Sequence, residues 1–149
     1  DSIRYFKHFL QAGLMAMEPQ TGHVKAWVGG INYKYFQYDH VGQGARQVGS
    51  TFKPFVYATA IEQLNMSPCD SIIDSPFTIP KGRHHVTEDW TPSNSDNKYR
   101  GMVTLKKALT NSINTISAKL KDRVGPEAVV ELDHTLRIKT DIPVPPSIT

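Results

Sequence analysis

Apolar residues recur at the spacing of an α-helix in three stretches of the chain. Residues 50–64, 104–125 and 126–136 carry apolar side chains three or four positions apart, which predicts three amphipathic helices. Ser50 is a favourable N-cap for the first of them. The expected buried stripe of that helix consists of Phe55, Ala58, Ile61 and Leu64. Residues 112–115 favour caps and turns, so a break is expected within the second helix.

An alternating pattern near the N-terminus predicts a β-hairpin. Residues 14–17 and 23–28 form its arms, and the Pro-Gln-Thr-Gly sequence between them is typical of a turn. Residues 2–11 are expected to form a short helix before it. Between residues 66 and 102 the periodicity fades, and prolines and glycines punctuate the chain. A connection of this length is uncommon in a compact domain and is usually functional.

Composition and charge exclude several kinds of function. The chain has 149 residues, of which 39% are hydrophobic and 21% charged, so it is large enough for one domain with a core. Its net charge of +3 is not gathered into a basic run, and no aromatic repeat suited to stacking bases is present. Nucleic acid is therefore not an expected partner. The sequence contains neither a long apolar run nor a signal peptide, which predicts no membrane span within it.

Metal and disulfide chemistry is not indicated either. Cys69 is the single cysteine, so the chain can form no internal disulfide and no cysteine metal site. The histidines lack ligand spacing, and the adjacent pair His84 and His85 lies in a polar segment, where a solvated surface is the simpler interpretation. We therefore expect no metal and no cofactor.

The sequence Ser50-Thr-Phe-Lys53 carries the clearest chemical signal. Residues three apart on a helix share a face, so the hydroxyl of Ser50 and the amine of Lys53 can share a proton, as an activated serine nucleophile requires. A serine at a helix N-terminus also lies near backbone N–H groups that can stabilise an oxyanion. Lys53 must be neutral to act as a base, and burial would lower its pKa. Taken alone, the pair fits a helix cap and a solvated lysine better.

Two further patterns bear on this interpretation. Ser95 and Lys98 repeat the S-x-x-K spacing, but they lie in a polar stretch without apolar periodicity and are expected to form a loop. Ser112-Ile-Asn114 fits an S-x-N pattern at the expected helix break. In isolation, its simplest interpretation is a pair of capping residues.

In order and spacing, these patterns resemble the transpeptidase domain of class A, bifunctional penicillin-binding proteins. The segments that carry the resemblance are residues 15–30, 46–55, 90–94, 99–101, 103–109 and 112–114. The resemblance implies an α/β (α+β) fold in which an antiparallel sheet is covered by helices and Ser50 begins a core helix. Residues 1–149 are expected to be the N-terminal part of one such domain, since the chain starts without methionine and reads as a piece of a longer protein.

The resemblance also assigns roles to particular residues. Ser50 is implied to be the acylated nucleophile, and Lys53 the base that takes its proton. Ser112 is implied to relay a proton to the leaving amine, and Asn114 to hydrogen-bond the substrate's amide. Trp90 is expected either to line the cleft or to be a buried core tryptophan.

The implied activity is peptidoglycan cross-linking by a serine D,D-transpeptidase. Its expected partners are peptidoglycan stem peptides, their lipid-linked precursor, and β-lactam antibiotics that acylate Ser50 as substrate mimics. The expected location is outside the cytoplasmic membrane, with membrane attachment only through an upstream anchor. A glycosyltransferase domain is also implied upstream of this chain.

One part of the family pattern is missing from these 149 residues. The third motif, K-T-G or K-S-G on a strand, is absent, because Lys139-Thr140 is followed by Asp141. We therefore expect this piece alone to have little or no transpeptidase activity and to expose unpaired sheet edges. Two alternatives stay open. A β-lactamase or β-lactam sensor would need a glutamate for deacylation, and Glu127 and Glu131 do not fit its pattern. The other alternative is a non-catalytic scaffold.

Overall fold

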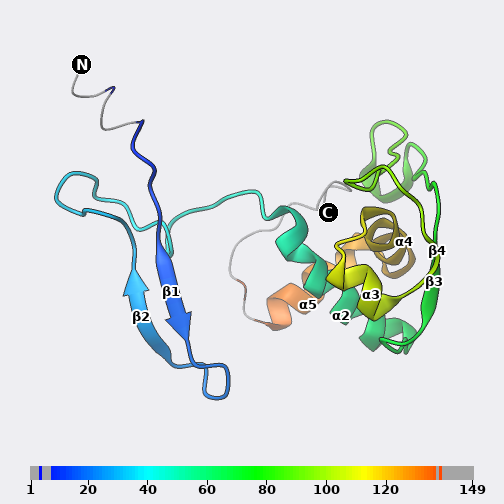
Figure 1. Ribbon diagram of the computed structural model, residues 1–149, viewed down its shortest axis with the longest axis horizontal. Helices are drawn as coiled ribbons and strands as arrows, with labels where there is room; N and C mark the ends of the chain where they lie inside the picture. The colour runs from blue at the N-terminus through cyan, green and yellow to red at the C-terminus, as the bar shows by residue number, and fades with distance from the viewer. Residues whose placement is uncertain (1–3, 5–7, 137, 139–149) are drawn as a thin grey trace. The chain divides into compact units, whose positions relative to one another are not determined.

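The chain consists of two compact units that divide between residues 47 and 48. The computed structural model describes residues 4, 8–136 and 138 (Figure 1). Its helices and antiparallel strands confirm the predicted α/β class. The strands form two separate two-stranded sheets, one in each unit. None of the described helices is long and apolar enough to cross a membrane.

The first unit contains the predicted hairpin. Strand β1 (Leu14–Met17) pairs with β2 (Val24–Val28) in antiparallel register, with a bulge near the turn. The turn is closed by the Glu18 N–H, which donates to the carbonyl of His23 at 2.9 Å. Every residue of both strands is exposed. Of the helix expected over residues 2–11, residues 2, 3 and 5–7 lie outside the described residues, Arg4 and His8 are helical, and residues 9–11 are not.

The second unit contains most of the helices. Its elements are the 3₁₀ turn η1 (Gly49–Phe52), α2 (Lys53–Leu64), β3 (Ser71–Asp74), the 3₁₀ turn η2 (Arg83–His85), β4 (Gly101–Thr104), α3 (Leu105–Thr110), α4 (Asn114–Val124) and α5 (Pro126–Thr135). Helix α4 packs against α2, α5 and β3. Figure 1 shows β3 and β4 side by side along one flank of these helices.

The first predicted helix forms, but its details differ from the expectation. Ser50 is not an N-cap: it lies inside η1, and no side chain caps that turn or α2. The buried residues of α2 are Lys53, Val56, Tyr57, Thr59 and Ala60. Three members of the predicted stripe, Ala58, Ile61 and Leu64, are instead exposed. Apolar residues occur almost all round this helix, so its sequence is compatible with more than one buried face. Packing against the neighbouring helices determines which face is buried.

Strands β3 and β4 were not predicted; β3 lies within the aperiodic region and β4 lies at its end. They pair in antiparallel register, with Ile72 opposite Val103 and Asp74 opposite Gly101. Both strands have four residues, too few for alternation to be recognised against the background. Val103 and Ile72 are buried, so this short sheet contributes its inner face to the core.

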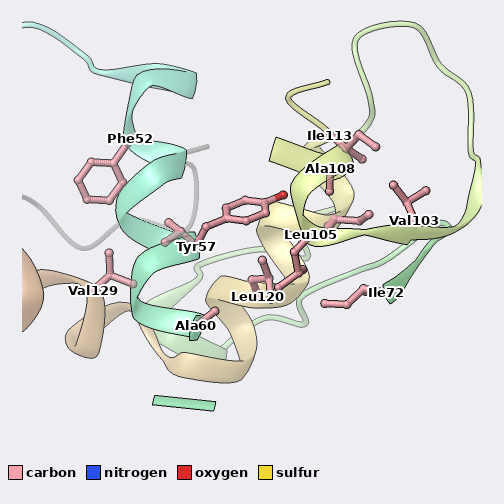
Figure 2. Close-up of a cluster of buried hydrophobic side chains, with 12 residues drawn as sticks. Phe52, Tyr57, Ala60, Ile72, Val103, Leu105, Ala108, Ile113, Leu120 and Val129 are labelled. Atoms are coloured by element: carbon pink, nitrogen blue, oxygen red, sulfur yellow. The ribbon is translucent and has the colours of Figure 1, made fainter. Parts of the chain in front are cut away.

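One hydrophobic core joins α2, α3, α4, α5 and the inner face of the β3–β4 sheet. Its buried residues are Phe52, Val56, Tyr57, Ala60, Ile72, Val103, Leu105, Ala108, Ile113, Ile116, Leu120 and Val129. Figure 2 shows Tyr57 extending from α2 toward α3 and α4, and its hydroxyl lies 3.5 Å from Ser117 Oγ. This packing places the start of α2 against the junction between α3 and α4, where the candidate site is found.

Candidate active site

Ser50 and Lys53 occupy the junction between a 3₁₀ turn and a helix. Gly49 opens η1 with a φ of +53°, a left-handed conformation that glycine adopts without steric cost. The backbone N–H of Lys53 donates to the carbonyl of Ser50, which closes the turn. Residues three apart in a 3₁₀ turn are aligned along its axis, so both side chains lie on one face. Ser50 is exposed, whereas Lys53 is 1% exposed.

The ammonium group of Lys53 is held by three acceptors from the second motif. Lys53 Nζ donates to the carbonyl of Ser112 at 2.7 Å, to Ser112 Oγ at 2.9 Å and to Asn114 Oδ1 at 2.6 Å. These contacts join segments about sixty residues apart in the chain. The structure therefore brings together three of the predicted site residues. Among the described residues, Ser50 Oγ makes no hydrogen bond with this cluster.

The protonation of Lys53 can change at this site. Three acceptors match the three N–H groups of a charged lysine. Burial lowers the pKa of Lys53 below its ordinary value of 10.5, because the charged form loses solvation. Once Lys53 is neutral, the Ser112 hydroxyl can reverse its role and donate to the amine, since a hydroxyl both donates and accepts. The Lys53 amine can therefore hold a proton, and the Ser112 hydroxyl can transfer it.

The backbone conformation at the C-terminus of α3 positions Ser112. The Ser112 N–H donates to the carbonyl of Leu109, and the Ile113 N–H to that of Ala108, both at 3.0 Å. This pair of bonds is the Schellman motif, which needs a left-handed residue at the position of Ser112. The φ of Ser112 is +52°. The predicted helix break is confirmed, and the left-handed turn directs both the carbonyl and the hydroxyl of Ser112 to Lys53.

Asn114 begins α4 with part of its amide still available. Its Oδ1 accepts from Lys53, and its Nδ2 donates to the carbonyl of Ser93 at 2.8 Å. An amide nitrogen carries two N–H donors, so one is left for a ligand. This capacity is compatible with the predicted contact to a substrate amide.

The other residues singled out in the sequence lie in the long connection. The backbone of Trp90 pairs with Ile79 through two 2.9 Å hydrogen bonds, and its side chain is half-buried. No described hydrogen bond joins Trp90 to the Lys53 cluster. The second S-x-x-K copy, Ser95 to Lys98, is an exposed non-helical turn, as predicted.

Sequence reasoning missed two buried polar residues beside the site. Asp74 is 1% exposed and Asn94 is 3% exposed, and both belong to one hydrogen-bond network with the start of α4. Asn94 lies in a segment that the sequence singled out, but nothing near Asp74 marked it. The sequence signal that could have indicated Asp74 is an aspartate directly after two isoleucines in a short strand. Within the described residues, no group of three or more His, Cys, Asp or Glu side chains could hold a metal ion.

The left-handed backbone of Ser112 leads to a stability prediction. Glycine adopts this conformation without the steric cost that a Cβ imposes. We expect Ser112→Gly to unfold with a free energy about 1 kcal/mol higher than Ser112→Ala, as measured by urea denaturation. Both variants lose the hydroxyl contact with Lys53, so the difference isolates the backbone. Equal stabilities would show that the turn imposes no strain on an L-residue.

Comparison with known proteins identifies the group to which this arrangement is similar. The family model described as "Penicillin binding protein transpeptidase domain" matches residues 12–143. Penicillin-binding protein 1A of Neisseria lactamica is 40% identical over 116 residues, which are 78% of this chain and 14% of that protein. The Aquifex aeolicus protein of the same name is 38% identical over 125 residues, 83% of this chain and 16% of that protein. The chain thus spans about one seventh of the length of such relatives.

Solved structures show the same similarity. Penicillin-binding protein 1A from Haemophilus influenzae matches 87% of this chain and 19% of its own, with a TM-score of 0.77 and 29% identity. PonA1 from Mycobacterium tuberculosis in complex with penicillin V matches 95% of this chain and 36% of its own, with a TM-score of 0.70 and 25% identity.

Proposed function

This chain belongs to the family of penicillin-binding protein transpeptidase domains, and on that basis we propose that it carries the serine nucleophile of a D,D-transpeptidase. The observation that supports this most is the buried Lys53, held by Ser112 and Asn114 one turn after the exposed Ser50. The family match includes residues of both compact units, which supports assigning both to one domain.

The proposed first step is acylation of Ser50. Neutral Lys53 takes the proton from Ser50 Oγ, which attacks the carbonyl carbon of the penultimate D-alanine in a stem peptide. Collapse of the tetrahedral intermediate breaks the peptide bond. The proton passes from Lys53 through the Ser112 hydroxyl to the leaving amine, and D-alanine departs. Asn114 donates its free amide N–H to the substrate backbone, which orients the scissile bond.

The proposed second step transfers the acyl group to another strand. An amine of a neighbouring stem peptide attacks the ester on Ser50, loses a proton to the amine of Lys53, and forms the cross-link. Ser50 Oγ recovers its proton as it leaves. A β-lactam replaces the stem peptide in the first step, since its strained amide presents a carbonyl to the same nucleophile. Trp90 is proposed to line the cleft that receives either ligand.

The oxyanion of both steps needs two backbone donors. The N–H of Ser50 is one candidate, and loss of one such donor typically costs about 10²–10³ in rate. The family pattern places the other on a K-T-G or K-S-G strand, which these 149 residues do not contain. We therefore propose that this chain alone acylates slowly or not at all. Peptidoglycan and its lipid-linked precursor are the proposed substrates, and the outer side of the cytoplasmic membrane is the proposed location.

Turnover of substrate and drug tests this function. The full-length product of the gene that encodes this chain is incubated with a stem pentapeptide ending in D-Ala-D-Ala and an acceptor amine. We expect release of D-alanine together with cross-linked product, and a benzylpenicillin adduct that persists for many turnover times. Rapid hydrolysis of penicillin would favour a β-lactamase instead. A folded protein that neither releases D-alanine nor forms an adduct would indicate a non-catalytic scaffold.

A further inference from the structure

A buried carboxylate lies at one end of a hydrogen-bond network that leads to the site. Asp74, the last residue of β3, accepts hydrogen bonds at Oδ1 from Asn94 Nδ2 at 2.9 Å and from the hydroxyl of Thr115. Its Oδ2 accepts from the backbone N–H of Arg100 at 3.0 Å. Burial alone would raise the pKa of Asp74, but these hydrogen bonds and the nearby charge of Arg100, whose Nη1 lies 3.6 Å from Oδ2, together outweigh it and lower the pKa. The carboxylate is therefore ionised in the folded protein at neutral pH.

Asn94 links the Asp74 carboxylate to the start of α4. Its Oδ1 accepts from the backbone N–H groups of Asn114 at 3.0 Å and Thr115 at 3.2 Å. Its Nδ2 donates to Asp74 and to the carbonyl of Lys98. Because the donors and acceptors around it differ, the orientation of this amide is fixed.

Helix α4 needs such a partner because its own N-cap cannot supply one. The N-cap residue is Ile113, whose side chain is buried in the core and has no polar atom. The first N–H groups of a helix lack intrahelical acceptors, and burying them unpaired would be costly. Asn94, twenty residues away in the sequence, provides the acceptor that a serine or aspartate N-cap would normally provide.

The network reaches Lys53 through Asn114. Asn114, whose backbone N–H is bound by Asn94, presents Oδ1 to Lys53 Nζ at 2.6 Å. The path from Asp74 through Asn94 and Asn114 to Lys53 is thus continuous, and each member is buried or half-buried. A shift of α4 by about 1 Å would lengthen the contacts to Lys53, and misplacement on that scale can cost about 10² in rate.

We propose that Asp74 and Asn94 are positioning residues that hold the start of α4 so that Asn114 and Ser112 meet the ammonium group of Lys53. The inference rests on the proposed function, because it assigns these residues to the same acylation site. Neither residue touches the nucleophile or the substrate in this assignment. They act through Asn114, and their effect appears in the protonation and placement of Lys53.

The test compares Asn94→Ala and Asp74→Asn with Ile72→Val. Asn94→Ala keeps the Asp74 charge and breaks the link, whereas Asp74→Asn keeps the shape and removes the charge. Ile72→Val is the matched control, since Ile72 lies on the same strand and the same face and only loses a methyl group in the core. Thermal unfolding of all variants measures the loss of stability that each causes.

Two readouts separate positioning from stability. The pKa of Lys53 is measured by NMR of the full-length gene product with isotopically labelled lysine, with Lys53→Met to assign the signal. We expect it to fall in Asn94→Ala and Asp74→Asn, because the acceptor that favours the charged amine is displaced, and to stay unchanged in Ile72→Val. In the full-length gene product, the rate of acylation by benzylpenicillin should fall about 10–100-fold in the first two variants and less than twofold in the control.

The outcomes distinguish this inference from the proposed function. If the wild-type protein is not acylated at Ser50, the proposed function fails, while the pKa comparison still tests the link between Asn94 and Lys53. If the wild-type protein is acylated but the two variants match Ile72→Val in pKa and rate, the positioning role is overturned. Should Asp74→Asn fail to fold, Asn94→Ala decides the question alone.

Discussion

Replacing Ser50 with alanine is expected to abolish covalent labelling of the full-length gene product by benzylpenicillin. The hydroxyl of Ser50 is the atom that would form the ester, and it is exposed one turn before the buried Lys53. The Ser112 hydroxyl is not expected to replace it, because Ser112 Oγ already accepts a hydrogen bond from Lys53 Nζ at 2.9 Å. Since Ser50 caps no helix and lies at the surface, the substitution should leave the thermal stability within about 0.5 kcal/mol of wild type.

The chain contains its own control for this experiment. Ser95 has a lysine three residues later, as Ser50 does, but it lies in an exposed turn outside any helix. Ser95→Ala should therefore be labelled at the wild-type rate. Full labelling of Ser50→Ala, or loss of labelling in Ser95→Ala, would show that the nucleophile has been assigned to the wrong serine.

Replacing Lys53 with methionine is expected to slow acylation by about 10²–10⁴-fold, the usual contribution of a general base. Methionine has a similar length but cannot accept a proton. In the wild-type protein the rate should rise with pH as Lys53 loses its proton, and it should level off below pH 10.5 because burial lowers this pKa. In Lys53→Met that dependence should disappear. Stopped-flow acylation with a chromogenic β-lactam between pH 5 and pH 10 measures both effects.

Folding must be followed in parallel for Lys53→Met. The variant leaves the Ser112 carbonyl and Asn114 Oδ1 without their donor, which costs free energy of unfolding. Lys98→Met is the matched control, because Lys98 occupies the corresponding place in the exposed second copy. A Lys53→Met protein that is folded and acylates with the wild-type rate and pH dependence would remove Lys53 from the mechanism.

Local sequence patterns were sufficient to predict the ends and breaks of several elements. Cap-forming residues around Ser112 indicated the break between α3 and α4, and the structure explains it as a Schellman motif with a left-handed serine. The Pro-Gln-Thr-Gly turn indicated the hairpin. In both cases the information lies within a few residues, since backbone conformation there is set by the neighbouring side chains.

The same local patterns could not predict contacts between residues that are far apart in the sequence. The buried face of α2 was predicted wrongly, because the helix is apolar almost all round and its face is chosen by α4 and α5. The contact between Lys53 and Asn114 was not predicted, because the resemblance implied a role for each residue but no bond between them. Asn94 Oδ1 accepts from the backbone N–H of Asn114, twenty residues further along the chain. Hydrophobic periodicity carries no information about such a bond.

Locating the benzylpenicillin adduct by tandem mass spectrometry tests the assignment of Ser50 as the nucleophile. The full-length gene product and the 149-residue chain are each incubated with the drug, digested and sequenced. We expect one modified residue, Ser50, in the full-length protein, and little or no adduct on the 149-residue chain. An adduct on Ser95, Ser112 or a lysine of the folded full-length protein, or none at all, would contradict this assignment.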